Sequence, residues 1–355
     1  MTIEAKPWTG KDLPKRVLAI RLQAMGDVMG TLPYLQDLRN SLPASVELDF
    51  LTREETDSIA KDLVLFNRVI SIGGGRSHKR QLLRTMLLLP WLLLQQYDVI
   101  IDLQHNDISG LVRRVLRPAA WSAFDRYSPI HGGERYRFTI EAVGLGPNKL
   151  EPHFRLREPG AGRAILKRAG CKEGEPLVLL NPAGAFATRN WEMEKYVQFA
   201  RLWLTDFPET RFLVLGTSLI ADKAAYLHAA LGHKLINLVG MTTPGEAFAV
   251  LQEVGLVLSE DSGLMHMAWT SGVPTMALFG STRTDWAKPL GQHSSYLDST
   301  DLACGSCMKS ICAFGDNRCM TRYTAEAIHR HCFELICSCA ILGRFLPPGL
   351  SSYIA

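Results

Sequence analysis

The chain lacks any run of about 18 apolar residues, the length that a membrane-spanning helix needs, so we expect no transmembrane segment. It also lacks an export signal, because its first fifteen residues carry lysines but no apolar stretch. We therefore expect a cytoplasmic protein, in which the eight cysteines do not form a disulfide framework.

A large excess of charge of one sign is missing too. The formal net charge is +4 over 355 residues, and charged residues make up 21% of the chain. So mild a balance favours no nucleic-acid partner, although it allows a local basic patch. Hydrophobic residues make up 47%, enough to bury two sizeable cores, and the length fits two domains better than one.

The nearest approach to a long apolar run, from Met86 to Leu94, is too short to cross a bilayer. One interpretation of this run is a buried helix. The other is a helix at a membrane surface, because Trp91 lies within the run and basic residues precede it. The preceding basic residues are Arg76, Lys79, Arg80 and Arg84.

Short apolar segments alternate with helical segments in both halves of the chain. The expected strands are 16–22, 46–51, 68–72 and 97–103 in the first half and 177–180, 212–215, 235–239, 256–259 and 275–279 in the second. This alternation predicts an α/β fold with two doubly wound, Rossmann-like domains facing across a cleft. The segment 150–170, which contains prolines and glycines, is expected to link them.

In such sheets ligands bind beyond the carboxyl ends of the strands, so the segments that follow the strands are candidate sites. The segment Glu260–His266 follows a buried strand and opens a helix, whose free amides suit a diphosphate. Gly263 allows close approach of a ligand, and His266, one turn further on, can donate to a phosphate oxygen. Alternatively, Asp261 or Ser262 only caps the helix and His266 is a surface residue.

Two further segments follow the first strand of each expected domain. In the second half, Asn181–Ala185 offers small residues, and Arg189 can pair with phosphate by two hydrogen bonds. In the first half, Met25-Gly26-Asp27 places a carboxylate at a helix start, where it is a candidate general base that the helix amides keep ionised. The alternatives are a solvated arginine and a capping aspartate. The dinucleotide fingerprint G-x-G-x-x-G is missing.

Together these segments resemble the heptosyltransferase family, the ADP-heptose:lipopolysaccharide heptosyltransferases of glycosyltransferase family 9. The order and spacing of the matching segments extend from Arg16 to about Arg322. The match is most specific over Asp261–His266 and Gly272–Pro274. The other matching segments are Arg16–Arg21, Met25–Val28, Thr31–Pro33, Asn181–Pro182, Arg189–Trp191 and Ala277–Gly280.

The resemblance implies a GT-B fold of two Rossmann-like domains, working by inversion without a metal at the reaction centre. The acceptor-binding domain is then 1–160, with a C-terminal helix at about 323–347 packing back on it. The domain 161–322 takes the nucleotide sugar. No cofactor is implied for catalysis.

By the same resemblance, Asp27 is the general base for the acceptor hydroxyl, and Arg189 contacts donor phosphate at a position usually held by lysine. Asp222 lies where an acidic residue holds the nucleoside ribose. The implied donor-binding residues are Thr188, Arg189, Asp222, Asp261, Ser262, Gly263, Leu264 and His266. A carboxylate on one side and cations on the other complement the charge separation of glycosyl transfer.

The implied acceptor is an anionic glycolipid of the lipopolysaccharide inner core, reached by peripheral contact with the inner membrane surface. A basic surface on the first domain suits its phosphate groups, although a solvated basic face is the alternative. The expected acceptor-binding residues are Met25, Gly26, Arg76, Lys79 and Arg80.

Four cysteines form a compact cluster at 304–319, Cys304-x2-Cys307-x4-Cys312-x6-Cys319. Four thiolates so spaced can hold a structural zinc or iron ion, although the spacing departs from the paired C-x2-C zinc pattern. Reduced thiols or one local disulfide are the alternatives. The loop resembles one in the second-heptose branch, heptosyltransferase II, of the family.

The expected activity is therefore transfer of heptose from ADP-heptose to a lipopolysaccharide inner-core acceptor. A same-fold transferase that uses another nucleotide sugar remains open, because the motifs specify a diphosphate better than a sugar. A catalytically inactive nucleotide-sugar-binding module is another alternative, against which Asp27, Arg189 and His266 argue. A nucleotide-sugar epimerase needs acid/base groups on both faces of the sugar, and the sequence indicates no second set.

Overall fold

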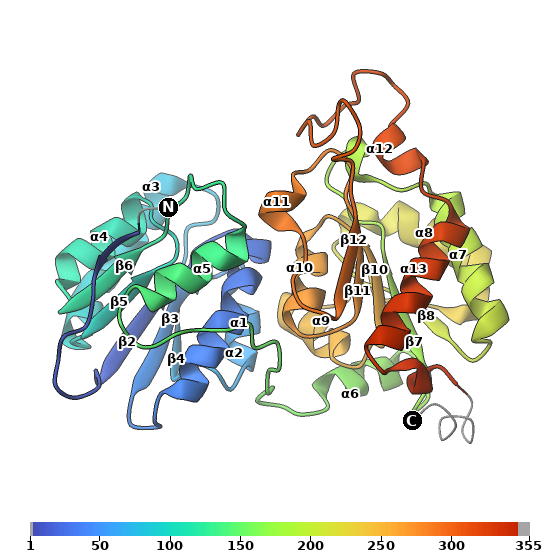
Figure 1. Ribbon diagram of the computed structural model, residues 1–355. Helices are drawn as coiled ribbons and strands as arrows, with labels where there is room; N and C mark the ends of the chain where they lie inside the picture. The colour runs from blue at the N-terminus through green and yellow to red at the C-terminus, as the bar shows by residue number, and fades with distance from the viewer. Residues whose placement is uncertain (1–2, 347–355) are drawn as a thin grey trace. The chain divides into compact units, whose positions relative to one another are not determined.

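The computed structural model describes residues 3–346, and the chain divides into two compact units, Met1–Pro159 and Gly160–Ala355 (Figure 1). Each unit is built around one six-stranded sheet. The structure therefore confirms the predicted α/β fold with two Rossmann-like domains.

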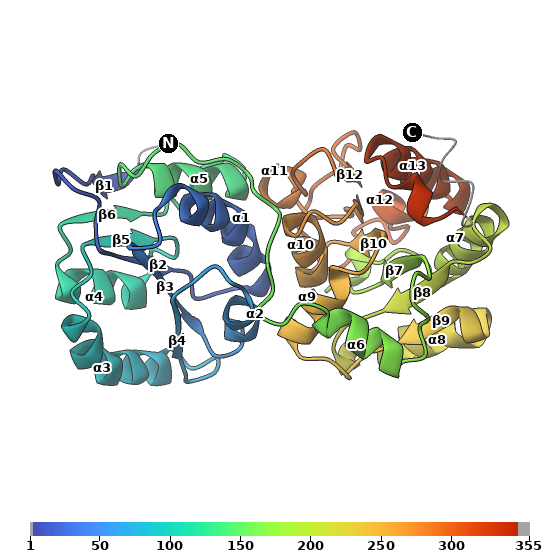
Figure 2. The same ribbon diagram turned by 90° about the horizontal axis from the view of Figure 1, so that it is seen from below.

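The first unit has a mostly parallel sheet between two layers of helices. Its strands are β1 (Glu4–Lys6), β2 (Arg16–Ile20), β3 (Glu47–Arg53), β4 (Arg68–Ile72), β5 (Val99–Asp102) and β6 (Ala120–Ala123). Its helices are α1 (Met25–Ser41), α2 (Asp57–Asp62), α3 (His78–Leu94), α4 (Asp107–Leu116) and α5 (Gly132–Glu141). The strand order is β1-β6-β5-β2-β3-β4, with only β1 antiparallel to its neighbour. Helices α1 and α5 lie on one face and α3 and α4 on the other (Figure 2).

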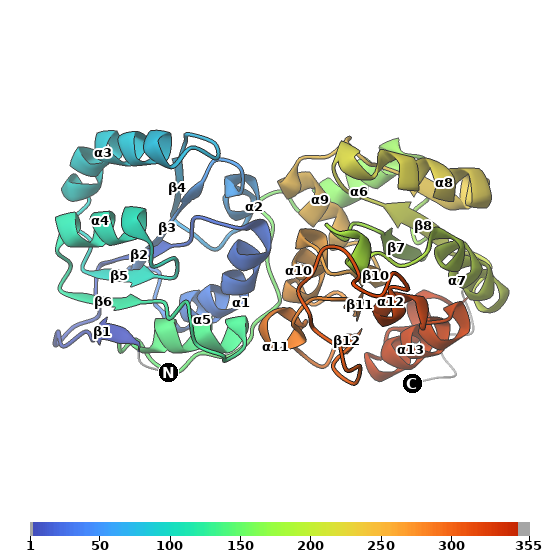
Figure 3. The ribbon, with the colours of Figure 1, turned by 90° about the horizontal axis from the view of Figure 1, so that it is seen from above.

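The second unit repeats this plan with a parallel sheet, ordered β12-β11-β10-β7-β8-β9 (Figure 3). Its strands are β7 (Leu177–Asn181), β8 (Arg211–Val214), β9 (Leu235–Asn237), β10 (Leu256–Glu260), β11 (Thr275–Leu278) and β12 (Ser294–Leu297). Its helices are α6 (Ala161–Arg168), α7 (Met193–Asp206), α8 (Ala221–Leu231), α9 (Pro244–Leu251), α10 (Gly263–Thr270), α11 (Thr284–Ala287), α12 (Arg318–Thr321) and α13 (Ala325–Ser338).

The order of strands reverses once in each sheet. The chain first builds outward from β2 through β3 to β4, and then places β5 on the other side of β2. In the second unit it builds from β7 to β9 and then places β10 beside β7. Because parallel strands end at the same edge, the loops after β2 and β5 lie together, as do the loops after β7 and β10.

The central strands are uniformly apolar because helices cover both of their faces. The side chains of Val17 to Ile20 in β2 and of Val99 to Ile101 in β5 are fully buried. Strands of this kind show no alternation of polar and apolar residues, which is why short apolar runs predicted them correctly.

The expected linker 150–170 is partly wrong, because α6 occupies residues 161–168. Gly162 allows this helix to pack closely on α9: a Cβ at that position would lie 2.1 Å from the carbonyl oxygen of Ala249. The glycine that suggested a flexible linker is therefore a packing residue.

Before the unit boundary, the chain is tied to the first unit through Arg157. Its backbone N–H donates to the carbonyl of Asp62 at 2.7 Å. Its guanidinium donates to the carbonyls of Lys61 at 2.8 Å and Phe66 at 2.9 Å. The chain thus passes from one unit to the other between Arg157 and Gly162.

The C-terminal helix α13 packs on the second unit, contrary to the expectation that the segment 323–347 packs back on the first domain. Its buried side chains, among them Ile328, Cys332 and Ile336, join the core that α7 contributes to. Position 347 lies outside the described residues. The apolar face of α13 was evident from the sequence, but the surface that covers it was not.

Helix α3 contains the apolar run Met86–Leu94, and most of that run is exposed. Leu92 is buried, whereas Leu87 and Leu94 are 67% and 77% exposed. The interpretation of this run as a buried helix is therefore wrong. Among residues 3–346, no helix is long and apolar enough to cross a membrane.

We expect Ile328→Ala to lower the free energy of unfolding of the second unit by about 2–5 kcal/mol, because it empties a fully buried site between α13 and the core. Urea denaturation would measure this loss. The exposed Glu334 on the same helix provides the control, and Glu334→Ala should change stability little. An unchanged stability of Ile328→Ala would contradict the packing of α13.

Candidate functional site

In the first unit, Asp27 lies in the first turn of α1, directly after β2 and at the strand-order reversal. Its Oδ2 accepts a hydrogen bond from the backbone N–H of Ala24 at 2.9 Å, which joins the carboxylate to the start of the helix. The side chain is 46% exposed. Met25 and Gly26 are half-buried beside it in the same turn. The carboxylate is thus fixed in place but remains accessible to a ligand.

A buried arginine holds the Asp27 carboxylate. Arg21 follows β2, and its Nη2 lies 2.9 Å from Asp27 Oδ2. Its Nη1 donates to the carbonyl of Leu103, after β5. The guanidinium also lies 5.2 Å from the ring centroids of Phe124 and Tyr136. These contacts place a positive charge against the carboxylate from the protein side.

Tyr136 of α5 provides the third donor to the carboxylate, with its hydroxyl 3.0 Å from Asp27 Oδ1. Burial, together with the charge of Asp27 and its hydrogen bond, raises the pKa of Tyr136 above its usual range, against the lowering effect of the Arg21 charge, so its hydroxyl remains a donor. Gly30 makes this contact possible, because a Cβ there would lie 2.9 Å from Cε2 of Tyr136. Helices α1 and α5 can therefore pack closely beside the site.

Gln104, after β5, shapes the loop that leads to Asp27. Its Oε1 accepts hydrogen bonds from the backbone N–H groups of Leu22 at 2.9 Å and Gln23 at 3.2 Å. The buried Asp102 in turn accepts from the backbone N–H of Gln104 and of His105. The sequence analysis assigned no role to Arg21 or Gln104. The only pattern in the sequence that indicated a role for these two residues was the polar residue directly after each expected central strand.

In the second unit, the loops after β7 and β10 are joined by side-chain hydrogen bonds. Asn181 Nδ2 donates to the hydroxyls of Ser259 and Ser262, each at 2.7 Å. Ser262 is also the N-cap of α10 and accepts from the backbone N–H of Met265 at 3.3 Å. The cap interpretation of Ser262 is therefore correct, and its role in binding a donor stays a prediction.

Arg189 lies next to Asp261, with its Nη1 3.0 Å from Asp261 Oδ2. Both side chains are largely buried, at 18% and 7% exposed, so Arg189 is not the solvated arginine of the alternative interpretation. Its guanidinium also contacts the ring of Phe186, 4.8 Å from the centroid. The 18% of the Arg189 side chain that is exposed is the part that a further ligand can reach.

Thr188 fixes the turn that presents Arg189. Its hydroxyl lies 2.9 Å from the hydroxyl of Ser281 and 2.7 Å from the carbonyl of Lys309. Gly280 permits close approach there, because a Cβ would lie 1.8 Å from the carbonyl oxygen of Thr188. Thr188 is buried, so it acts on the shape of the site rather than as an exposed ligand group.

His266 lies half-buried in α10, and the indole N–H of Trp269 donates to its Nδ1 at 3.1 Å. Because an indole N–H can only donate, Nδ1 accepts and the ring proton lies on Nε2. His266 is thus a donor through Nε2. Gly263 and Leu264 are half-buried in the first turn of the same helix, near its free amides.

The sequence analysis named Glu260 within its motif but gave it no role. This fully buried carboxylate accepts from the backbone N–H of Gly184 through Oε2 and of Trp191 through Oε1, each at 2.7 Å. Burial raises the pKa of Glu260 to about 7, opposed by Lys223 and by these backbone donors. A charged residue at the end of an apolar strand was the available signal.

Lys223, in the first turn of α8, completes this arrangement. Its Nζ lies 3.9 Å from Glu260 Oε2 and donates to the carbonyl of Pro182 at 2.7 Å and to Oδ1 of Asn190. Its neighbour Asp222 is exposed in the same turn. The start of α8 therefore borders the loop after β7. That Asp222 holds the ribose of a nucleotide stays a prediction.

Two of the five expected acceptor residues, Arg76 and Arg80, line a cavity of about 1060 Å³ in the first unit. The loop after β4, including Gly73 to Gly75, also lines it, together with Glu54, whose Oε1 accepts from the backbone N–H of Gly74 at 3.3 Å. Gly74 adopts a left-handed conformation, with φ of 118°, which favours glycine. Lys79 is exposed next to the cavity without lining it.

The structure gives no support to the zinc or iron site expected at Cys304, Cys307, Cys312 and Cys319. Within residues 3–346, no group of three or more His, Cys, Asp or Glu side chains is arranged to hold a metal ion. The four cysteines are free thiols. Cys319 is half-buried, and its Sγ donates to the carbonyl of Thr188 at 3.8 Å, whereas Cys304 and Cys307 are exposed. The loop braces the Thr188 turn instead.

Two sets of expected residues are thus brought together, one in each unit. Met25, Gly26 and Asp27 gather after β2, held by residues after β5. Around the loops after β7 and β10 the structure gathers Thr188, Arg189, Asp261, Ser262, Gly263, Leu264 and His266. Arg76, Lys79 and Arg80 lie separately, at the start of α3.

Comparison with models of protein families identifies a match to a glycosyltransferase family. The model of glycosyltransferase family 9 (heptosyltransferase) matches residues 134–317. This range includes the whole set of second-unit residues described above, together with Tyr136 of the first unit.

Curated relatives that are named heptosyltransferases match this chain over most of their length. Lipopolysaccharide heptosyltransferase 1 of Pseudomonas aeruginosa is 24% identical over 84% of this chain and 88% of the relative. Lipooligosaccharide heptosyltransferase 2 of Haemophilus influenzae is 25% identical over 79% of this chain and 88% of the relative. First- and second-heptose relatives thus match to a similar degree.

Solved structures show the same fold. The glycosyl transferase family 9 structure from Veillonella parvula has a TM-score of 0.78 at 18% identity, covering 92% of this chain and 99% of the other. The E. coli ADP-heptose lps heptosyltransferase II has a TM-score of 0.70 at 17% identity, covering 90% and 98%.

We expect Glu260→Gln to lower the free energy of unfolding by about 1–3 kcal/mol at pH 8. The amide can accept from only one of the two backbone N–H groups, so either Gly184 or Trp191 would keep a buried donor unpaired. Urea denaturation measures the difference, with the exposed Glu209→Gln as control. A loss no larger than that of the control would rule out this role for the carboxylate.

The same variant should have a pH-dependent effect, because the pKa of Glu260 is about 7 in the folded chain against an ordinary 4.5. Between these values the folded state binds a proton that the unfolded state has lost, so this group adds stability as the pH falls through 7. The stability difference between wild type and Glu260→Gln should therefore grow from pH 8 to pH 5, by at most roughly 1.4 kcal/mol per pH unit. A difference independent of pH would contradict the raised pKa.

Proposed function

Because this chain belongs to glycosyltransferase family 9, the heptosyltransferases, we propose that it transfers a heptose from ADP-heptose to a lipopolysaccharide inner-core acceptor. The family membership makes it a glycosyltransferase. The observation that supports the proposal most is the pair of residue sets at the two strand-order reversals. One set offers a proton acceptor, and the other offers donors for a departing diphosphate.

In this proposal Asp27 is the general base. One of its oxygens takes the proton of the acceptor hydroxyl as the hydroxyl oxygen bonds to the anomeric carbon of the heptose. Arg21 and Tyr136 orient the carboxylate, and its 46% exposure leaves room for the hydroxyl. A single displacement from the face opposite the diphosphate inverts the configuration at the anomeric carbon.

The second unit stabilises the leaving group. As the bond between the anomeric carbon and the diphosphate oxygen breaks, negative charge grows on the diphosphate. In this proposal the exposed part of Arg189 pairs with the diphosphate, His266 contributes its ring, which carries its proton on Nε2, and the free amides of the first turn of α10 contribute their N–H groups. These groups are all held before the donor binds, so little reorganisation is needed. The proposal requires no metal cofactor.

Asp261 has a second consequence for donor binding. Its carboxylate already neutralises part of the charge of Arg189. A diphosphate beside Arg189 therefore meets a near-neutral ion pair rather than a bare cation, which limits the affinity for the product nucleotide and favours its release. Thr188 and Asp222 would complete the donor contacts by shaping the turn and by holding the ribose.

An anionic acceptor suits the cavity at the start of α3. Arg76 and Arg80 line it, and within the described residues neither has a carboxylate at ion-pair distance. Phosphate groups or acidic sugars of an inner-core glycolipid would provide the missing counter-charge. Lys79 would add long-range attraction. We propose that the chain works in the cytoplasm, in peripheral contact with the inner membrane where such an acceptor is embedded.

We expect the purified protein to transfer sugar from ADP-heptose to a heptose-free inner-core acceptor, and Asp27→Asn to lower the rate by at least 100-fold, because the amide cannot take the proton. A panel of nucleotide sugars, with product detected by mass spectrometry, measures the donor preference. The matched control is Asp107→Asn, an exposed aspartate of the same unit, which should keep full activity.

The outcomes separate the alternatives. Turnover of another nucleotide sugar, still lost in Asp27→Asn, would replace the heptose and keep the mechanism. Binding of nucleotide sugar without turnover of any would indicate an inactive module. Full activity of Asp27→Asn with ADP-heptose would show that Asp27 is not the general base.

A further inference from the structure

Helix α3 carries an apolar stripe on its solvent side. Leu83, Leu87, Pro90 and Leu94 recur every three to four residues and so lie on one face of the helix. The three leucines are 58%, 67% and 77% exposed. Met86, 50% exposed, widens the stripe. Scattered exposed leucines are ordinary, but a contiguous stripe along a whole helix indicates a surface that is covered in use.

The stripe is flanked by positive charge. Helix α3 contains no acidic residue, and four basic residues lie at its start: Arg76, Lys79, Arg80 and Arg84. Arg114 and Arg117 are exposed on the adjacent helix α4, which packs beside α3 on the same face of the sheet (Figure 2). Within the described part of the chain, no carboxylate pairs with any of these six cations. Asp107 and Glu54 are the nearest acidic groups placed on this side, in α4 and in the cavity wall.

The stripe and the cavity are continuous. Leu83 and Leu87 belong to the stripe and also line the cavity that Arg76, Arg80 and Arg84 border. An amphiphile fits such a surface, because its charged head group meets the arginines while its apolar chains meet the leucines.

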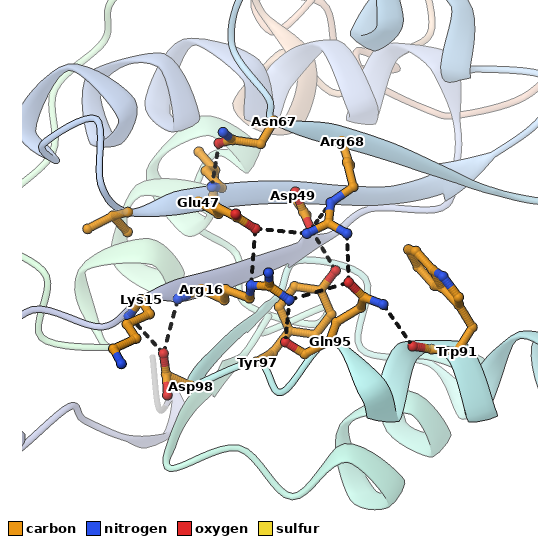
Figure 4. A network of polar contacts seen from close by, with 12 residues as sticks. Lys15, Arg16, Glu47, Asp49, Asn67, Arg68, Trp91, Gln95, Tyr97 and Asp98 are labelled. Atoms are coloured by element: carbon orange, nitrogen blue, oxygen red, sulfur yellow. Dashed lines mark hydrogen bonds and ion pairs between the residues drawn. The ribbon is translucent and has the colours of Figure 1, made fainter.

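Side-chain contacts hold the C-terminal end of α3 against the sheet, so the exposure of its apolar side chains does not result from fraying of the helix. At its C-terminal end Trp91 lies against the guanidinium of Arg68, 5.9 Å from the ring centroid (Figure 4). Gln95 Nε2 donates to the carbonyl of Trp91 at 3.2 Å, and Arg68 and Arg16 both donate to Gln95 Oε1, at 2.6 Å and 3.3 Å.

This network of contacts continues into the strands of the sheet. Arg68 and Arg16 share Glu47 Oε2, at 2.8 Å and 3.1 Å, and Arg68 Nε lies 3.3 Å from the buried Asp49. Arg16, Glu47 and Arg68, which Figure 4 shows in this network, are the first residues of β2, β3 and β4. The loop after β4 that lines the cavity lies at the other end of that strand. The helix therefore extends from the edge where the candidate acceptor cavity lies to the opposite edge of the sheet, with its stripe facing outward.

We propose that α3 is a membrane-docking helix, which places its apolar stripe among the acyl chains at the surface of an anionic phospholipid bilayer. The arginines of α3 and α4 then lie in the head-group layer. The inference deepens the proposed function, because it rests on an acceptor that is itself embedded in a bilayer. The occupant is a bilayer rather than a second protein because the stripe is ringed by cations with no acidic partner.

Vesicle sedimentation tests the proposal. The full chain should bind vesicles of phosphatidylglycerol and phosphatidylethanolamine, and bind phosphatidylcholine vesicles at least tenfold more weakly. Met86→Glu combined with Leu94→Glu should weaken binding to the anionic vesicles at least tenfold, because both side chains lie in the stripe but outside the cavity lining. The control is Leu13→Glu, which changes a leucine that is 53% exposed in the same unit but outside α3 and should bind as wild type does.

A thermal midpoint equal to that of wild type would show that the double variant is folded. Wild-type failure to bind anionic vesicles, or equal binding by a folded double variant, would overturn the proposal. So would a shift from dimer to monomer in the double variant with vesicle binding unchanged, since that result would make the stripe an interface between two copies.

A transfer assay with a deacylated, water-soluble acceptor separates the two proposals. If both wild type and the double variant transfer heptose equally while only wild type binds vesicles, docking and function are both supported. If neither transfers any sugar but the vesicle results hold, the proposed function fails and the docking helix stands. If both transfer and neither binds, the docking helix alone fails.

Discussion

The reversal of strand order in each sheet is the constraint on which the rest of this structure depends. It brings the ends of two central strands together at one point, β2 with β5 and β7 with β10, and leaves a gap between the helices that cover them. The residues with a proposed role in proton transfer or leaving-group stabilisation come from the loops, or from the first turns of the helices, that follow these strands. The same constraint explains why both central strands are fully buried: only strands covered on both faces can present their ends in this way.

Both units have a similar electrostatic arrangement at these points. A carboxylate lies in or next to each crevice, and each is held by a cation and by backbone donors: Asp27 by Arg21 and the N–H of Ala24, and Glu260 by Lys223 and two backbone N–H groups. The difference lies in exposure. The Asp27 side chain is 46% exposed, whereas Glu260 is fully buried and joins the loops after β7 and β10. Under the proposed function, two similar arrangements therefore serve chemistry in one unit and shape in the other.

Much of the fold was predictable because central strands that are buried on both faces leave short apolar runs in the sequence, as β2 and β5 show. The motif at Asp261 and Ser262 was predictable for the same reason, since a cap follows directly after a strand. The failures all depend on distant partners. Gly162 can be recognised as a packing residue only when its close approach to Ala249 is known. The residues of α13 alone do not show which core this helix packs against. The roles of Arg21 and Glu260 likewise arise from residues far away in sequence, and the cysteine spacing suggested a metal where the chain forms a brace.

The tight anchoring of the chain on both sides of residue 160 limits how the two units can move. Arg157 is bound to the first unit and Gly162 is pressed against α9, so only residues 158–161 are free to change their backbone angles. Any change in the orientation of one unit relative to the other must be absorbed by this short hinge. The stiffness of the hinge, set by Pro159 and Gly160, would then govern the rate of such a change. Turnover could be tuned there without altering a single group that touches either substrate.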